Sequence, residues 1–134
     1  MNEKKICFTN GCFDILHRGH IELLKFCREN SDYVVVGLNS DKSVKINKGD
    51  SRPYNNQEDR KVVLEALRYV DEVIVYNEKT PLELVTKVQP DLLVKGSDYA
   101  NKEVVGRGIA KEVILFGYID GYSSTNTIQD ITDR

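Results

Sequence analysis

Short hydrophobic runs alternate along this chain with stretches in which apolar residues recur at helical spacing. Five of these runs are rich in β-branched and aromatic residues and contain few polar positions, which is typical of strands buried on both faces of a parallel sheet. The pattern therefore predicts strands at residues 5–9, 33–38, 73–76, 92–94 and 113–116.

Capping residues mark the expected helix starts between these strands. Asn55 with Glu58 three residues later predicts a capping box. The helix behind it should bury its apolar residues Val62, Val63, Ala66, Leu67 and Val70. Thr80 followed by Pro81 predicts another helix start. A first helix is expected to end near residue 30, and a short terminal helix is expected around residues 127–131.

Strands that alternate with helices predict an α/β fold. We expect a Rossmann-like, open and mostly parallel sheet of five strands with helices on both faces, in one domain that spans residues 1–134. Residues 42–56 are polar and contain four basic side chains, so they are expected to form a loop that becomes ordered when an anion binds. Within this loop Lys48 is the candidate anion-binding residue, because the flexible Gly49 beside it lets the ammonium group move to a ligand.

Composition narrows the functional classes. The chain has 40% hydrophobic and 30% charged residues and a net charge of -2, which argues against a general nucleic-acid or membrane-surface binder. Its three cysteines, Cys7, Cys12 and Cys27, are too few and odd in number for a disulfide scaffold. Charged residues after Met1 and the lack of a long apolar run predict no signal peptide and no membrane span, so we expect a cytoplasmic protein.

The candidate chemistry is concentrated between the first strand and the first helix. His17 and His20 lie three residues apart at the expected helix start, so they project from the same turn. Backbone N–H groups at a helix start lack intrahelical partners and favour an anion. Together these features predict a polyphosphate ligand. A zinc site is a weaker alternative, because the chain has only two histidines and no C-x-x-C pair.

Other polar residues follow the expected strands and should meet at the same edge of the sheet. Asn39 ends the second strand, Lys95 to Tyr99 follow the fourth, and Ser123 to Thr125 precede the terminal helix. Arg60 lies near a helix start, where a positive charge is unfavourable, so we expect it to bind an acceptor or phosphate; a surface ion pair with Glu58 or Asp59 is the alternative.

Several of these segments resemble a known family. His17-Arg18-Gly19-His20 is similar to the H-x-G-H motif of the nucleotidyltransferase superfamily of small cytidylyl- and adenylyltransferases, and Asn10 to Asp14 match the segment before it. The segments at residues 48–53, 91–99 and 121–126 resemble the adenylyltransferase domain of bifunctional ADP-heptose synthases. The nearest rival is glycerol-3-phosphate cytidylyltransferase, which residues 68–74 resemble.

The resemblance implies a reaction and its residues. An acceptor phosphate would attack the α-phosphorus of a nucleoside triphosphate, preferably ATP, and pyrophosphate would leave; heptose 1-phosphate is the favoured acceptor. His17, His20 and Lys48 would be catalytic. Asp14 would either touch Mg²⁺ through water or orient a histidine. The implied nucleotide-binding residues are Asn10, Gly11, Cys12, Phe13, Asp14, Gly19, Lys95, Gly96, Asp98, Ser123, Ser124 and Thr125.

Mg²⁺ would be carried mainly by the phosphate oxygens, without a metal site of protein ligands. The expected partners are a nucleoside triphosphate, a small phosphorylated acceptor and a second copy of the chain in a homodimer. A non-catalytic nucleotide sensor on the same fold is the alternative from another class, because fold alone does not fix function.

Overall fold

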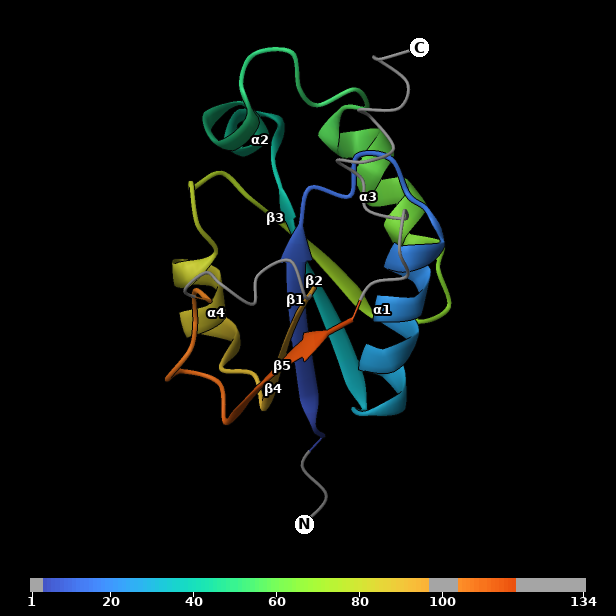
Figure 1. Ribbon diagram of the computed structural model, residues 1–134, viewed down its shortest axis with the longest axis vertical. Helices are drawn as coiled ribbons and strands as arrows, with labels where there is room; N and C mark the ends of the chain where they lie inside the picture. The colour runs from blue at the N-terminus through green and yellow to red at the C-terminus, as the bar shows by residue number, and fades with distance from the viewer. Residues whose placement is uncertain (1–3, 97–103, 118–134) are drawn as a thin grey trace.

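The computed structural model of this chain describes residues 4–96 and 104–117. These residues form one sheet in the order β3-β2-β1-β4-β5, and every neighbouring pair of strands is parallel (Figure 1). The strands are β1 (Ile6–Gly11), β2 (Tyr33–Asn39), β3 (Glu72–Tyr76), β4 (Leu92–Gly96) and β5 (Glu112–Phe116). The predicted five-stranded parallel sheet is confirmed.

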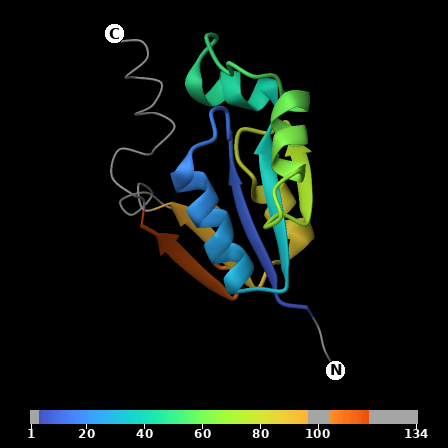
Figure 2. The same ribbon diagram turned by 90° about the vertical axis from the view of Figure 1, so that its right-hand side faces the viewer.

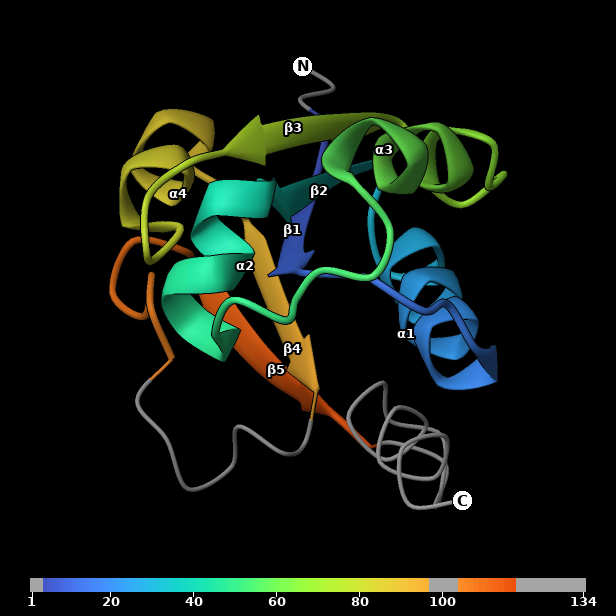
Figure 3. The same ribbon diagram turned by 90° about the horizontal axis from the view of Figure 1, so that it is seen from above.

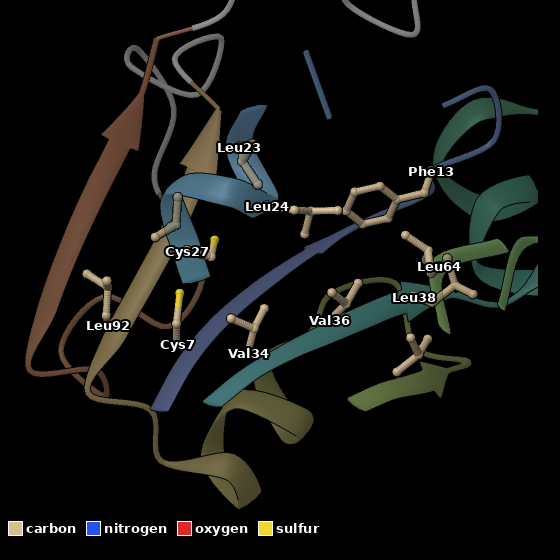
Figure 4. Close-up of a cluster of buried hydrophobic side chains, with 12 residues drawn as sticks. Cys7, Phe13, Leu23, Leu24, Cys27, Val34, Val36, Leu38, Leu64 and Leu92 are labelled. Carbon is tan, nitrogen blue, oxygen red and sulfur yellow. The ribbon is translucent and has the colours of Figure 1, made fainter. Parts of the chain in front are cut away.

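Helices cover both faces of the sheet, as predicted (Figure 2). On one face α1 (Arg18–Glu29) and α3 (Gln57–Glu65) bury Leu24 and Leu64 against the valines of β2. On the other face α4 (Leu82–Val88) and the segment around Val104 cover Phe8 and Leu93. Figure 4 shows the first of these two cores, in which the side chains of Cys7 and Cys27 point toward each other; all three cysteines are free thiols.

The helix α2 (Asp41–Lys48) corrects the prediction of a loop over residues 42–56. The Ser40 side chain caps it by accepting a hydrogen bond from the Ser43 N–H, and Val44 is buried. The helix was missed because it buries so few residues that its sequence shows no apolar stripe. It lies above the carboxyl ends of the strands, on the side of α4 (Figures 1 and 3).

The start of α3 is also corrected. Its cap is Asn56, which accepts from the Asp59 N–H at 2.8 Å, and not Asn55. The face predicted to be buried is partly wrong, because Val62 and Val63 are 65% and 48% exposed whereas Arg60 and Leu64 are buried. At the start of α4 the cap position belongs to Pro81 instead of Thr80. The predicted terminal helix lies outside the described residues.

At the amino edge of the sheet, three aspartates stand directly before β2, β3 and β4. Each carboxylate accepts a hydrogen bond of 2.8 to 2.9 Å from a backbone N–H at the start of a neighbouring strand: Asp32 from Lys5, Asp71 from Val34 and Asp91 from Ile6. These bonds hold the amino ends of neighbouring strands together. Within the described residues, no helix is both long and apolar enough to cross a membrane.

Candidate active site at the carboxyl edge of the sheet

A tight turn follows β1 and carries the predicted site. Phe13 has a φ of 47°, in the left-handed region, and its buried side chain enters the core beside Leu24. Gly11 makes room for this side chain, since an added Cβ would lie 3.2 Å from the ring. The Phe13 ring packs against that of His20, with the ring centroids 5.4 Å apart. The Phe13 ring therefore supports the His20 ring by packing against it. The backbone of Phe13 itself has the strained geometry that is common at functional sites.

The two histidines close the first turn of α1. His17 is the N-cap residue, and its Nδ1 accepts from the Gly19 N–H at 3.0 Å. His20 Nδ1 accepts from the His17 N–H at 3.2 Å, and the two ring centroids are 4.0 Å apart. Because both Nδ1 atoms accept, each neutral ring carries its proton on Nε2. The Gly19 N–H donates to His17, and the predicted nucleotide-binding role of Gly19 stays a prediction.

Burial keeps both rings neutral. It lowers the pKa of His17, and it lowers the pKa of His20 to about 3, with further lowering by the charges of His17 and Lys48. At neutral pH these side chains are therefore hydrogen-bond donors through Nε2–H and are not cations.

Positive charges from three elements converge on the turn. Burial raises the pKa of the Cys12 thiol, while the charges of Lys48, Arg60 and Lys95 oppose that rise. Lys48 is exposed in the last turn of α2, where its charge also acts on His20. These positive charges would favour an anion at this edge of the sheet, and the predicted binding of a polyphosphate stays a prediction.

Lys95 lies in β4 and is only 5% exposed. Its Nζ donates to the backbone oxygen of Asn10 at 3.3 Å and to the side-chain oxygen of the same residue. The structure thus brings together Asn10 and Lys95, two of the predicted nucleotide-binding residues. Gly96 is the buried last residue of the same strand.

The Asp14 carboxylate accepts backbone hydrogen bonds from a segment that lies 40 residues further along the chain. Its Oδ2 accepts from the Tyr54 N–H at 2.6 Å and its Oδ1 from the Asn55 N–H at 2.8 Å. The Asn55 side chain donates back to the Asp14 backbone oxygen at 2.7 Å. The carboxylate therefore holds the segment after Pro53 over the turn, and its predicted roles toward Mg²⁺ or a histidine stay predictions.

Arg60 also holds segments of the site together. It is 2% exposed, which corrects the alternative of a surface ion pair with Glu58 or Asp59, while its predicted binding of an acceptor or phosphate stays a prediction. Its guanidinium donates to the backbone oxygens of Cys12, Asn39 and Asn55 and forms an ion pair of 2.8 Å with Asp41. Four segments around the site are joined by this one side chain.

Asn39 is the other residue predicted to bind an acceptor or phosphate, and that role stays a prediction. It is 6% exposed, and its amide donates to Ser43 Oγ at 2.9 Å, which fixes the first turn of α2. Asp98, Ser123, Ser124 and Thr125 lie outside the described residues, so their predicted roles stay predictions.

A polar pocket of about 290 Å³ lies between the start of α2 and the start of α3. No sequence pattern pointed to it, because its walls come from separate elements; they are Asp41, Lys45, Pro53, Tyr54, Asn55, Asn56 and Asp59. Two carboxylates in the lining make it unsuited to phosphate. Among residues 4–96 and 104–117, no three His, Cys, Asp or Glu side chains gather in a group that could hold a metal ion.

Comparison with known proteins agrees with this geometry. Residues 8–129 match the model of the cytidylyltransferase-like family. The chain is 56% identical over 131 residues to the bifunctional protein HldE of Campylobacter concisus and 52% identical to that of Aliarcobacter butzleri. In each case the match covers 98% of this chain but only 28% of the relative.

Two solved structures share the fold. The lipopolysaccharide core biosynthesis protein of Thermoplasma volcanium aligns with a TM-score of 0.74 and 28% identity, over 88% of this chain and all of the other. Pantoate-beta-alanine ligase of Francisella tularensis aligns with a TM-score of 0.63 and 18% identity, over all of this chain and 73% of the other, a likeness of fold alone.

Proposed function

The chain belongs to the cytidylyltransferase-like family, and on that premise we propose that it is a nucleotidyltransferase. It joins the nucleotidyl group of a nucleoside triphosphate to a small phosphorylated acceptor. An acceptor phosphate oxygen forms a bond to the α-phosphorus as the bond from that phosphorus to the bridging oxygen breaks, and pyrophosphate leaves with that oxygen.

The observation that carries this proposal is the orientation of the two histidines. Both Nδ1 atoms accept from backbone N–H groups, so both rings carry their proton on Nε2 within the same turn. Negative charge grows on the departing pyrophosphate, and fixed donors aimed at such charge are among the largest contributions to catalysis. Neutral rings can serve this purpose throughout the neutral pH range, because no proton has to be taken up first.

The nearby cations supply the rest of the charge stabilisation. Lys48 is exposed at the end of α2 and is the residue proposed to neutralise the α-phosphate or the acceptor phosphate. Lys95 is held at the end of β1 by Asn10 and adds positive charge to the phosphate-binding region. Ser124 and Thr125 are proposed to hold the β- and γ-phosphates, in line with the family resemblance of residues 121–126.

Mg²⁺ is proposed to arrive with the triphosphate. Both carboxylate oxygens of Asp14 already accept backbone N–H groups, and the described residues offer no cluster of metal ligands. A Mg²⁺ ion bound mainly through phosphate oxygens and water fits this arrangement and would add positive charge to the triphosphate.

For the substrates, ATP and heptose 1-phosphate are the preferred pair, in the synthesis of a precursor of surface carbohydrate. The support is the resemblance of residues 91–99 and 121–126 to ADP-heptose synthases, the identity of 50% or more to several HldE proteins, and the structural similarity to a lipopolysaccharide core biosynthesis protein. Because this chain spans 28% of the HldE proteins, the activity is proposed for the matching part alone.

A substrate panel tests the proposal. Pyrophosphate release is measured with ATP, CTP, GTP and UTP against heptose 1-phosphate, glycerol 3-phosphate and related phosphates. ATP with heptose 1-phosphate should give the fastest release. A tenfold advantage of CTP with glycerol 3-phosphate would instead assign the chain to the cytidylyltransferase alternative. Nucleotide binding without pyrophosphate release from any pair would support the sensor.

Two further proposals concern the state of the protein. A homodimer would cover the exposed apolar side chains of Val62 and Val63 on α3. Sedimentation analysis of the wild type and of a Val62→Glu variant tests this proposal. A wild-type dimer that dissociates when the charge is introduced supports it, and a wild-type monomer contradicts it.

A cytoplasmic location is consistent with the free thiols of Cys7 and Cys27, which face each other in the core without a disulfide.

A further inference from the structure

A row of polar side chains crosses the face of the sheet that α4 covers. Asn10 lies two residues after the buried Phe8 on β1, and Lys95 lies two residues after Leu93 on β4, so both point to this face. Tyr76, the last residue of β3, belongs to the same core cluster and is 4% exposed. The three residues thus come together at the carboxyl end of the otherwise apolar face, next to the candidate active site.

These side chains form a directed chain of hydrogen bonds. The amide nitrogen of Asn10 donates to the Tyr76 hydroxyl at 3.0 Å. With its nitrogen held by Tyr76, the amide directs its oxygen toward β4, where it accepts from Lys95 Nζ. The backbone oxygen of Asn10 accepts from the same ammonium group at 3.3 Å. Both acceptors are neutral, so they orient the ammonium without cancelling its charge.

The Asn10–Tyr76 bond has to pass over β2, since that strand lies between β1 and β3. Strands separated by one neighbour are roughly 10 Å apart. Gly37, which is paired with Asn10 in register, leaves this path open. A Cβ at Gly37 would lie 2.6 Å from Phe8 Cζ and 3.2 Å from the Asn10 Cβ, which is too close for either to remain in place. This packing accounts for a glycine inside a strand whose other core residues are branched.

The geometry points to a role for Tyr76 beyond core packing. We propose that Tyr76 is a positioning residue: through the amide of Asn10 it fixes the ammonium group of Lys95 where that cation binds a phosphate group of the substrate. The proposal rests on the proposed function only in requiring that the site bind phosphate. The effect of the Lys95 charge on the Cys12 thiol places that charge within electrostatic reach of the glycine turn.

Affinity for inorganic pyrophosphate with Mg²⁺, measured by titration calorimetry on the full chain, tests the proposal without requiring turnover. Lys95→Met should weaken binding by about tenfold or more, the scale for a hydrogen bond to a charged group. Tyr76→Phe removes one hydroxyl and should weaken binding by about 3- to 10-fold. In the Lys95→Met background, Tyr76→Phe should have no further effect, because the residue it positions is gone.

Tyr33→Phe is the matched control. The Tyr33 hydroxyl donates to Glu72 at 3.0 Å on the exposed surface at the amino edge, so its loss should leave pyrophosphate affinity unchanged. Urea unfolding of each variant confirms that binding is compared between folded proteins, and Lys95→Gln replaces Lys95→Met if the latter does not fold.

Two results would overturn the proposal. One is an equal loss of affinity from Tyr76→Phe with and without Lys95, which would mean that the hydroxyl acts on general packing. The other is unchanged affinity in either single variant. Failure of the proposed function is distinguishable, since a chain that releases no pyrophosphate from any substrate pair can still show the Lys95-dependent effect of Tyr76 on binding.

Discussion

The two ends of the parallel strands are built from opposite charges and use them differently. At the amino edge, Asp32, Asp71 and Asp91 each accept a backbone N–H of a neighbouring strand. Asp71 also pairs with Arg28, and Asp91 pairs with Lys111 at 2.9 Å. These carboxylates therefore act within the protein, joining one strand to the next.

At the carboxyl edge three cations, Lys48, Arg60 and Lys95, act on the turn that carries the two histidines, while Asp14 and Asp41 are engaged by backbone N–H groups and by Arg60. Of the three cations around Cys12, Arg60 forms an ion pair with Asp41, and Lys48 is exposed at the end of α2. Charges that are paired inside the protein contribute to stability, whereas an exposed cation can reach a ligand. The comparison predicts that substitutions at the amino edge change stability and substitutions at the carboxyl edge change chemistry.

The largest effect is expected at the histidines. His17→Asn keeps a good cap residue and His20→Gln keeps an acceptor at the third helical position, but both remove the Nε2–H. Turnover should fall by about 10²–10³, the scale for losing one transition-state donor, while the urea midpoint stays nearly unchanged. Steady-state kinetics measure the turnover, and urea unfolding measures the stability.

His17→Ala and His20→Ala serve for comparison, because His17→Ala should in addition lose about 1 kcal/mol of capping stability. Near-normal turnover in the cap-preserving variants would remove the proposed mechanism.

The next effect belongs to the amino edge. Asp71→Ala leaves the Val34 N–H without its acceptor and Arg28 without its ion-pair partner. The free energy of unfolding should fall by about 1–3 kcal/mol, with kcat and KM of the folded protein unchanged. Asp71→Asn retains one acceptor oxygen and should cost less. A clear change in KM for either substrate would show that the two edges are not functionally separate.

A smaller effect is expected at Lys48. Lys48→Ala should lower kcat/KM by about tenfold, because it removes one charge-assisted contact to phosphate. A parallel fall in kcat would show that the charge acts in the transition state, and a rise in KM alone would show that it only holds the substrate. Lys42→Ala, in the first turn of the same helix, is the control and should be nearly silent. Equal and small effects at the two positions would remove Lys48 from the site.

The last prediction concerns the dependence of stability on pH. The folded His20 has a pKa of about 3, while an unfolded histidine titrates near 6.5. As pH falls below 6.5 the unfolded chain therefore binds the proton first, and stability decreases by up to about 1.4 kcal/mol per pH unit for this residue. Urea unfolding at pH 5, 6 and 7 should show this slope, and His20→Gln should reduce it.

Turnover should show no step between pH 6 and 8 that is caused by these histidines. A step near pH 6.5 that His20→Gln abolishes would contradict their neutral state.

Much of the fold was predictable because its determinants are local. A run of branched residues forms a buried strand wherever it occurs, and the five strands predicted from such runs form the parallel sheet that the structure contains. The pairing of His17 and His20 was also predictable, since residues three apart at a helix start share a turn whatever surrounds them. The helix α2 was missed because only Ser43 and Val44 are buried, and two buried residues leave no periodic pattern.

The roles of the buried polar residues were decided by tertiary structure. Asp14 meets a backbone N–H 40 residues away, Arg60 a carbonyl 48 residues away, and Lys95 the oxygens of a residue 85 positions earlier. A buried polar group must find a hydrogen-bond partner, but the sequence does not say which of the many distant candidates the fold will bring to it. The same holds for the proton on each histidine, because the backbone of the folded turn donates to Nδ1 and so places the proton on Nε2. Local sequence patterns located the candidate site, whereas the packing of distant segments decided how its side chains are held.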